Sequence, residues 1–133
     1  MKGFTIIEII IVVVMLGILA SIAVPRVIGP NEQITSSEGR QTLTTLLGAQ
    51  KRFFMENNNT YANNINSLDV DIPASNYFAA PNINNNAAQL ASVARANGPV
   101  YTLSINDTGV ITCAGAGCAI ARCTKNPGGD RCN

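Results

Sequence analysis

The chain has 133 residues, the size of one domain, and nine lysines and arginines against eight acidic residues give a net charge of +1. Charged residues make up 13% of the chain, below the typical ~25%. This low share argues against a protein held on nucleic acid by bulk charge and against a disordered charged tail. The chain contains no histidine. This excludes histidine-dependent catalytic triads, the common zinc enzymes and haem sites with histidine ligands. We therefore expect no enzymatic activity and no cofactor.

The first feature along the chain is an apolar segment from Phe4 to Val24, in which Glu8 is the only charged residue. As an α-helix rising about 1.5 Å per residue, this segment would be roughly 31 Å long, enough to cross a hydrocarbon core of about 30 Å. The positive charge of Lys2 favours a cytoplasmic N-terminus. The sequence therefore predicts a membrane-spanning helix, with the rest of the chain outside the cytoplasm.

Three kinds of segment have an apolar run that can be compared with this one. A secretory signal peptide has a shorter apolar region, of about 7 to 15 residues. A plain single-span anchor fits the length but gives no reason for Glu8, because a carboxylate within a span costs about 2.5 to 3.5 kcal/mol. The third kind explains the glutamate, since the residues Lys2-Gly3-Phe4-Thr5-Ile6-Ile7-Glu8 resemble the processing motif of type IV prepilins and of type II secretion pseudopilins.

The resemblance assigns a role to each of three residues. In that family a prepilin peptidase cuts after the glycine and methylates the new N-terminus. The resemblance therefore implies a leader of residues 1–3 ending at Gly3, a methylated Phe4 and a buried Glu8. The amine of Phe4 and the carboxylate of Glu8 would lie one helical turn apart. In a bundle of such helices, the amine of one chain could neutralise the glutamate of its neighbour.

The apolar helix, residues 4–30, is predicted to kink or break where Pro25, Gly29 and Pro30 interrupt it. Either one kinked helix continues outward, or a separate helix begins at Asn31 or Thr35. Residues 31–57 are amphipathic and are expected to be helical, with one side covering a globular head. Its predicted buried stripe is Ile34, Leu43, Leu46, Leu47, Gln50, Phe53 and Phe54.

Residues 58–98 are predicted to form an asparagine-rich loop between the helix and a sheet, because asparagine is a poor helix former and is common in turns. From residue 99 the pattern predicts strands at 100–105 and 110–113, joined by a turn at 106–109, and a third strand at 118–123. The expected fold class is α+β, similar to type IV pilins, with a long N-terminal helix packed on a small antiparallel sheet.

All four cysteines lie in the last part of residues 99–133, which suggests disulfides formed in an oxidising compartment. We favour a bond from Cys113 to Cys118 and another from Cys123 to Cys132, each closing a short loop, although two other pairings are open. A zinc site of four thiolates is a weaker alternative, because the spacings lack the close pairs of structural zinc sites. We expect no bound metal.

The resemblance implies a structural subunit that rests in the inner membrane and then assembles into a helical filament with other copies and other pilins. Its further partners would be the prepilin peptidase and the type IV pilus assembly machinery, and the filament would serve adhesion, motility or DNA uptake. A type II secretion pseudopilin is the alternative, but the major form typically has a calcium site of acidic residues, and this region offers only Asp107 and Asp130. Nucleic-acid binding has weak support from three cations, Arg122, Lys125 and Arg131.

Overall fold

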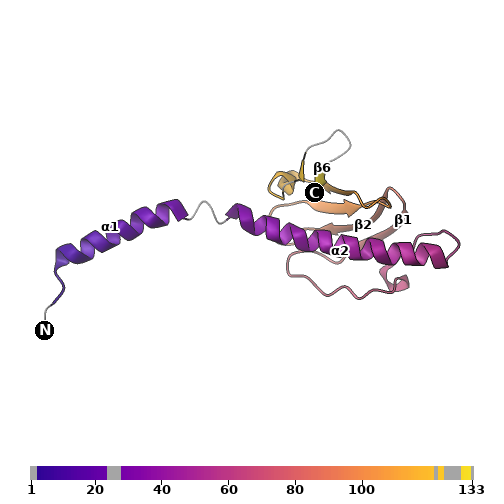
Figure 1. The fold of residues 1–133 in the computed structure, drawn as a ribbon, viewed down its shortest axis with the longest axis horizontal. Coiled ribbons are helices and arrows are strands. Elements are labelled where there is room, and N and C mark those ends of the chain that lie inside the picture. Colours follow the sequence, from indigo (N-terminus) through magenta and orange to yellow (C-terminus); the bar gives the residue numbers. More distant parts are fainter. Residues whose placement is uncertain (1–2, 24–27, 122, 125–129, 133) are drawn as a thin grey trace. The chain divides into compact units, whose positions relative to one another are not determined.

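The computed structural model describes residues 3–23, 28–121, 123–124 and 130–132. Its internal contacts divide the chain into two units, residues 1–32 and residues 33–133, and we call the second the head. Two helices come first, α1 at Ile6–Ala23 and α2 at Ile28–Glu56, and the strands follow them along the chain (Figure 1). This order confirms the α+β fold class.

Helix α1 contains mostly isoleucine, valine and leucine. It is 18 residues long, shorter than the apolar run of the sequence because Phe4 and Thr5 lie before its first turn. Within the described residues, no helix combines the length and the hydropathy needed to cross a membrane. The membrane span predicted for residues 4–24 is therefore not found in the part of the chain that the structure describes.

Helix α2 begins earlier than the alternatives considered for a second helix. Ile28 is its first residue, so Gly29 and Pro30 lie in its first turn and do not end a helix. Proline is tolerated there because the amide N–H groups of a first turn have no partner within the helix. The interruption predicted at Gly29 and Pro30 is therefore wrong, and Pro25 lies outside the described residues. Helix α2 ends at Glu56, where Asn58 and Asn59 adopt positive φ angles of 48° and 59°, as residues after a helix often do.

One side of α2 forms the core of the head. Leu43, Leu46 and Gln50 are fully buried and Leu47 is 9% exposed, as the amphipathic pattern predicts. The prediction is wrong for Ile34, whose side chain is 70% exposed. Ile34 lies on the outer side of the helix, because Ser36 and Gly39, which are buried, are the residues of that turn that face the core. A Cβ on Gly39 would lie 2.7 Å from the ring of Phe78, so only glycine fits this contact without displacing the ring.

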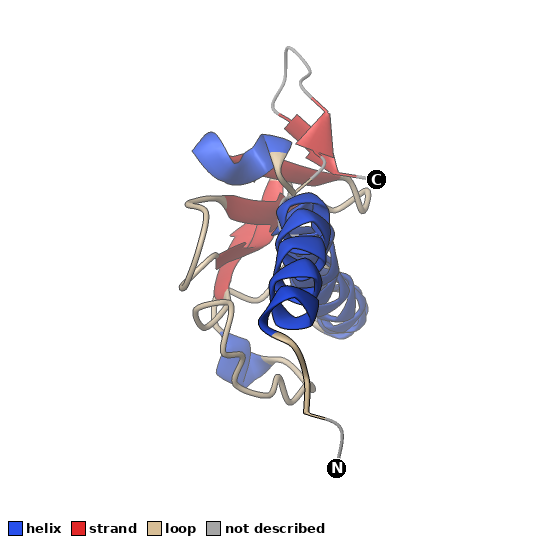
Figure 2. Cartoon of the chain, turned by 90° about the vertical axis from the view of Figure 1, so that its left-hand side faces the viewer, coloured by secondary structure: helices blue, strands red, loops and turns tan. Residues whose placement is uncertain are grey.

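The sheet contains six antiparallel strands in the order β1-β2-β3-β4-β6-β5 (red in Figure 2). The strands are β1 Asn82–Asn86, β2 Gln89–Ala94, β3 Thr102–Ile105, β4 Ile111–Ala114, β5 Cys123–Thr124 and β6 Asp130–Cys132. Val93 pairs with Leu103, and Leu103 pairs with Cys113 on its other side. These three side chains are buried, so one row across the sheet contributes to the core.

Two parts of the sheet differ from the sequence prediction. Strands β1 and β2 lie inside residues 58–98, which the sequence predicts to be a loop, because the apolar side chains of β2 fill the core and β1 pairs with it despite its asparagines. The strand predicted at 118–123 is wrong, since residues 116–119 form a 3₁₀ helix and β5 begins only at Cys123. The strands predicted around the turn at 106–109 are confirmed as β3 and β4.

Gln50 ties helix α2 to the loop that follows it. Its buried side-chain amide donates to the carbonyl of Ala62 at 2.9 Å and accepts from the amide N–H of Ala62 at 2.9 Å. The same Nε2 lies 3.4 Å from the carbonyl of Asn84 in β1. One side chain therefore hydrogen-bonds to the backbone of two segments, the loop at Ala62 and strand β1.

Replacing Gln50 by leucine is expected to lower the free energy of unfolding by about 2 to 4 kcal/mol, because it leaves both buried polar groups of Ala62 without partners. Urea unfolding of the full chain in detergent, followed by near-ultraviolet circular dichroism, measures the change. Lys51→Leu, at the exposed neighbouring position, is the matched control and should change stability by less than about 0.5 kcal/mol. Equal effects of the two variants would contradict the role given to Gln50.

Candidate functional site

The segment before helix α1 leaves the peptide bond between Gly3 and Phe4 open. Residues 3–5 are not helical, and α1 begins at Ile6. The side chain of Phe4 is 84% exposed, and no atom lies within 4 Å of a Cβ built on Gly3. An exposed, non-helical peptide bond is the form that a peptidase can bind, so the geometry permits cleavage at this position.

Glu8 has a partner just before its own helix, Thr5. The amide N–H and the hydroxyl of Thr5 donate to its Oε2, at 3.4 and 3.3 Å, and the Thr5 hydroxyl accepts from the amide N–H of Glu8 at 3.4 Å. This reciprocal arrangement is a capping box, in which a threonine before the helix and a glutamate three residues later satisfy N–H groups that the helix leaves free. The sequence analysis missed it, although a threonine followed by a glutamate at that spacing before an apolar run is its signal.

The apolar side chains of α1 are exposed. The large ones from Ile6 to Leu19 are all between 51% and 81% exposed. Burying such side chains releases about 25 cal/mol for each Å² removed from water, and contiguous exposed apolar surface marks a region that contacts another molecule or a membrane. Helix α1 therefore presents a surface that is suited to an apolar environment.

The C-terminal part of the head carries two disulfides. Cys113 is bonded to Cys118 and Cys123 to Cys132, with Cα atoms 5.8 and 4.2 Å apart, which is the pairing favoured from the sequence. The sulfurs of Cys113, Cys123 and Cys132 lie within 4.8 Å of one another, so the two bonds are neighbours. They join β4 to the 3₁₀ helix and β5 to β6, which holds together the edge of the sheet where strands are shortest.

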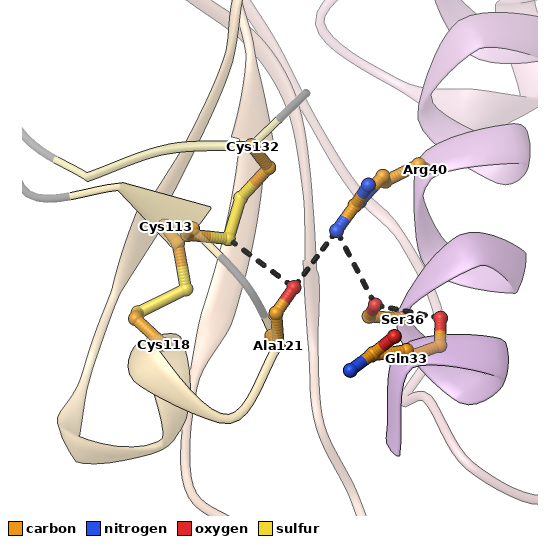
Figure 3. Close-up of a disulfide and its surroundings, with 8 residues drawn as sticks. Gln33, Ser36, Arg40, Cys113, Cys118, Ala121 and Cys132 are labelled. Carbon is orange, nitrogen blue, oxygen red and sulfur yellow. Dashed lines mark hydrogen bonds between the residues drawn. A yellow bond between two sulfur atoms is a disulfide. The ribbon is translucent and has the colours of Figure 1, made fainter. Parts of the chain in front are cut away.

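Arg40 connects this edge to helix α2 (Figure 3). Its Nη2 donates to the carbonyl of Ala121 at 2.8 Å and lies 3.4 Å from the hydroxyl of Ser36, which in turn donates to the carbonyl of Gln33 at 2.9 Å. Ala121 is fully buried, and its carbonyl oxygen also lies 4.0 Å from the sulfur of Cys123. A charged donor on a buried carbonyl makes a strong hydrogen bond, so the stapled edge is fixed against the helix.

The remaining residues singled out in the sequence are spread over the chain. The cations Arg122 and Lys125 lie outside the described residues, and Arg131 lies in β6, where it pairs with Thr112 and Thr124. Asp130 also lies in β6, opposite Cys113. Asp107 lies in the turn between β3 and β4, and its amide N–H donates to the carbonyl of Ala87 at 2.9 Å.

Comparison with known proteins gives relatives of two kinds. Over 55 residues the chain is 47% identical to the type IV major pilin protein PilA of Myxococcus xanthus, which corresponds to 41% of this chain and 25% of PilA. Over 56 residues it is 38% identical to the type II secretion system core protein G of Klebsiella pneumoniae, 42% of this chain and 40% of that protein. These relatives match the pilin and pseudopilin family.

The similarity is local. The matched part of the chain spans between a quarter and two fifths of the length of these relatives, and the core protein G of Pectobacterium carotovorum, 35% identical over 57 residues, is matched over 36% of its length. No family model matches the chain. No solved structure matches it. The family resemblance predicted from residues 2–8 is thus supported by curated relatives over less than half of the chain.

Proposed function

We propose that this chain is a structural subunit of a type IV pilus. The observation that carries the proposal is helix α1, whose large apolar side chains are exposed from Ile6 to Leu19 and whose only charged side chain is Glu8. A bundle of such helices from many copies buries this surface and leaves the heads outside. The similarity to a major pilin supports the same role.

The proposed route begins in the inner membrane, with the N-terminus in the cytoplasm and the head in the periplasm. Prepilin peptidase cleaves between Gly3 and Phe4, at the exposed peptide bond before α1, and methylates the amine of Phe4. The assembly machinery then adds the subunit to a filament at the cell surface, where it supports adhesion, motility or DNA uptake. The disulfides suit a head that folds outside the cytoplasm.

In the filament, Glu8 changes its partner. In the single chain its carboxylate accepts hydrogen bonds from Thr5. Between packed helices, the amine of Phe4 of one copy neutralises the Glu8 carboxylate of its neighbour, because a buried charge is stable only when it is paired. The capping box thus holds the carboxylate at the start of the helix, where a neighbouring amine can reach it.

A pseudopilin of a type II secretion system is the second candidate, and the similarity to three core G proteins favours it. Cysteines in place of clustered acidic residues in the C-terminal region favour the pilus. Deleting the gene in its own host separates the two functions. Loss of surface fibres with normal protein secretion supports a pilin, and loss of secretion with intact fibres supports a pseudopilin.

Replacing Gly3 by valine is expected to leave the precursor uncut, with at least a tenfold loss of mature subunit, because the branched side chain occupies the open position next to the cleaved bond. Intact-mass measurement of the membrane fraction from the native host distinguishes a chain that begins at methylated Phe4 from the precursor. Gly17→Val is the matched control, since Gly17 in α1 is equally open, and it should be processed normally. Normal cleavage of the Gly3 variant, or cleavage of the unaltered chain after Ala23, would contradict the proposal.

A further inference from the structure

A groove crosses the head between helix α2 and the loop that leads to the sheet. Figure 1 shows this loop beside α2. It consists of two adjoining cavities of about 290 and 330 Å³ that share Thr42, Ile72, Pro73 and Ala74. The first is lined by apolar side chains that include Ile65, Phe78 and Val93. Together they have the size of a site for one or two side chains of a partner.

The second cavity makes one end of the groove acidic. Glu38, Gln41 and Asp71 line it. Among the described residues, neither carboxylate forms an ion pair or a side-chain hydrogen bond, and the only lining groups besides them are neutral. The groove therefore presents an apolar end next to two carboxylates, and a cation beside an apolar side chain is its chemical complement.

The chain itself carries such a complement. Lys51 and Met55 are both exposed, Met55 by 74%, and residues four apart lie on the same face of a helix about 6 Å from each other. Within the described residues, no hydrogen bond or ion pair engages the Lys51 ammonium. Methionine is flexible enough to fill an irregular apolar cavity. Of the large exposed apolar side chains of the head, Met55 is the one on a helix with a lysine four residues before it.

We propose that the groove binds the Lys51–Met55 face of a second copy of this chain, with Met55 in the apolar cavity and Lys51 at Glu38 and Asp71. At about 100° per residue, Lys51 lies roughly 140° and Met55 roughly 100° around α2 from Glu38, so the two surfaces face different directions. One copy can thus offer its Lys51–Met55 face to one neighbour while its groove receives the face of another. A head-to-tail contact of this kind builds an open filament, and in this respect the inference rests on the proposed function.

Photo-crosslinking of the full chain in its host tests the contact, with p-benzoylphenylalanine in place of Met55. The expected adduct joins that position to residues 72–75 or to Phe78 of a second copy, mapped by mass spectrometry. The probe in place of Val100, an exposed side chain of the head that does not line the groove, is the control and should not label the groove. Adducts of the Met55 probe only elsewhere, only with another protein, or not at all would overturn the proposal.

Charge reversal then tests the complementarity. Lys51→Glu should reduce the groove adduct at least fivefold, and adding Glu38→Lys with Asp71→Lys should restore it. Asn85→Glu adds a negative charge at an exposed position of strand β1 outside the groove and should leave the adduct unchanged. An unchanged adduct with Lys51→Glu, or no restoration by the triple variant, contradicts the proposed pairing.

The same samples separate this contact from the filament proposal. Groove adducts in membranes, with no copies of the chain in sheared surface fibres, would support the contact between copies and contradict the pilus. Fibres built from this chain without groove adducts would support the pilus and contradict the contact.

Discussion

Replacing Glu8 by alanine is expected to abolish surface filaments while the amount of subunit in the membrane stays within about twofold of normal. In a filament, the amine of each Phe4 would be buried without its partner, and breaking one side of a buried ion pair costs about 3 to 5 kcal/mol. In the membrane, the substitution removes a carboxylate that costs about 2.5 to 3.5 kcal/mol in an apolar span. Immunoblots of the membrane fraction and of sheared filaments from the native host measure both quantities.

Glu8→Gln distinguishes the two roles of this side chain. Glutamine can replace glutamate in a capping box, so it keeps the hydrogen bonds with Thr5 but cannot neutralise an amine. If ion pairing between copies drives assembly, the glutamine variant should lose filaments as the alanine variant does. Abundant filaments with glutamine would show that capping alone is needed, and abundant filaments with alanine would contradict the pilin assignment.

Removing either disulfide is expected to destabilise the head. Changing Cys123 and Cys132 together to serine should lower the free energy of unfolding by about 2.6 kcal/mol, and the same change at Cys113 and Cys118 by about 2 kcal/mol, because the first bond closes the longer loop. The sequence separations are 9 and 5. The part of the head that follows Asn57 is small enough for losses of this size to matter at growth temperature.

Urea unfolding of the two double variants in detergent checks these values. The unaltered chain should also show, under non-reducing conditions, a mass four hydrogens below that of the reduced chain, since both bonds are present. Two free thiols in the exported protein, or double variants as stable as the unaltered chain, would contradict the role given to these bonds.

Local sequence signals predicted the parts of the fold that depend on a few neighbouring residues. The turn at 106–109 is such a case, because Asn106 Oδ1 accepts from the amide N–H of Val110 at 2.8 Å and Gly109 supplies a φ of +86°. The end of α2 before Asn58 and Asn59 is another. Both follow from residue types that tolerate positive φ or hydrogen-bond to nearby backbone.

The parts of the fold that the sequence predicted wrongly depend on contacts between residues that lie far apart in the chain. Strand β1, with the sequence NINNN, has low strand propensity and forms because it pairs with β2, whose Leu90, Ala91 and Val93 are buried in the core. The chain does not continue as a strand after Ala114, because Gly115 has a φ of +125°, outside the strand region. A Cβ at Gly115 would also lie 2.6 Å from the carbonyl oxygen of Val100. The sequence of neither segment shows which distant residues it contacts.

The candidate site likewise contains features that a short local motif predicts and a feature that depends on residues far apart in the chain. The roles of Gly3, Phe4 and Glu8 come from the family resemblance of a short motif. The spacing of Thr5 and Glu8 alone predicts the capping box. The sequence analysis missed it because it interpreted Glu8 by its charge and not by its position in the first turn. The groove between α2 and the loop was not predictable, because it joins residues as far apart in the chain as Glu38 and Val93.

Mass spectrometry of purified surface fibres sheared from the native host tests the central claim most directly. If this chain is a pilus subunit, the fibres contain many copies of it, each beginning at a methylated Phe4 and carrying both disulfides. Fibres that lack the chain, while it remains in the membrane fraction with an uncut N-terminus, would contradict the account.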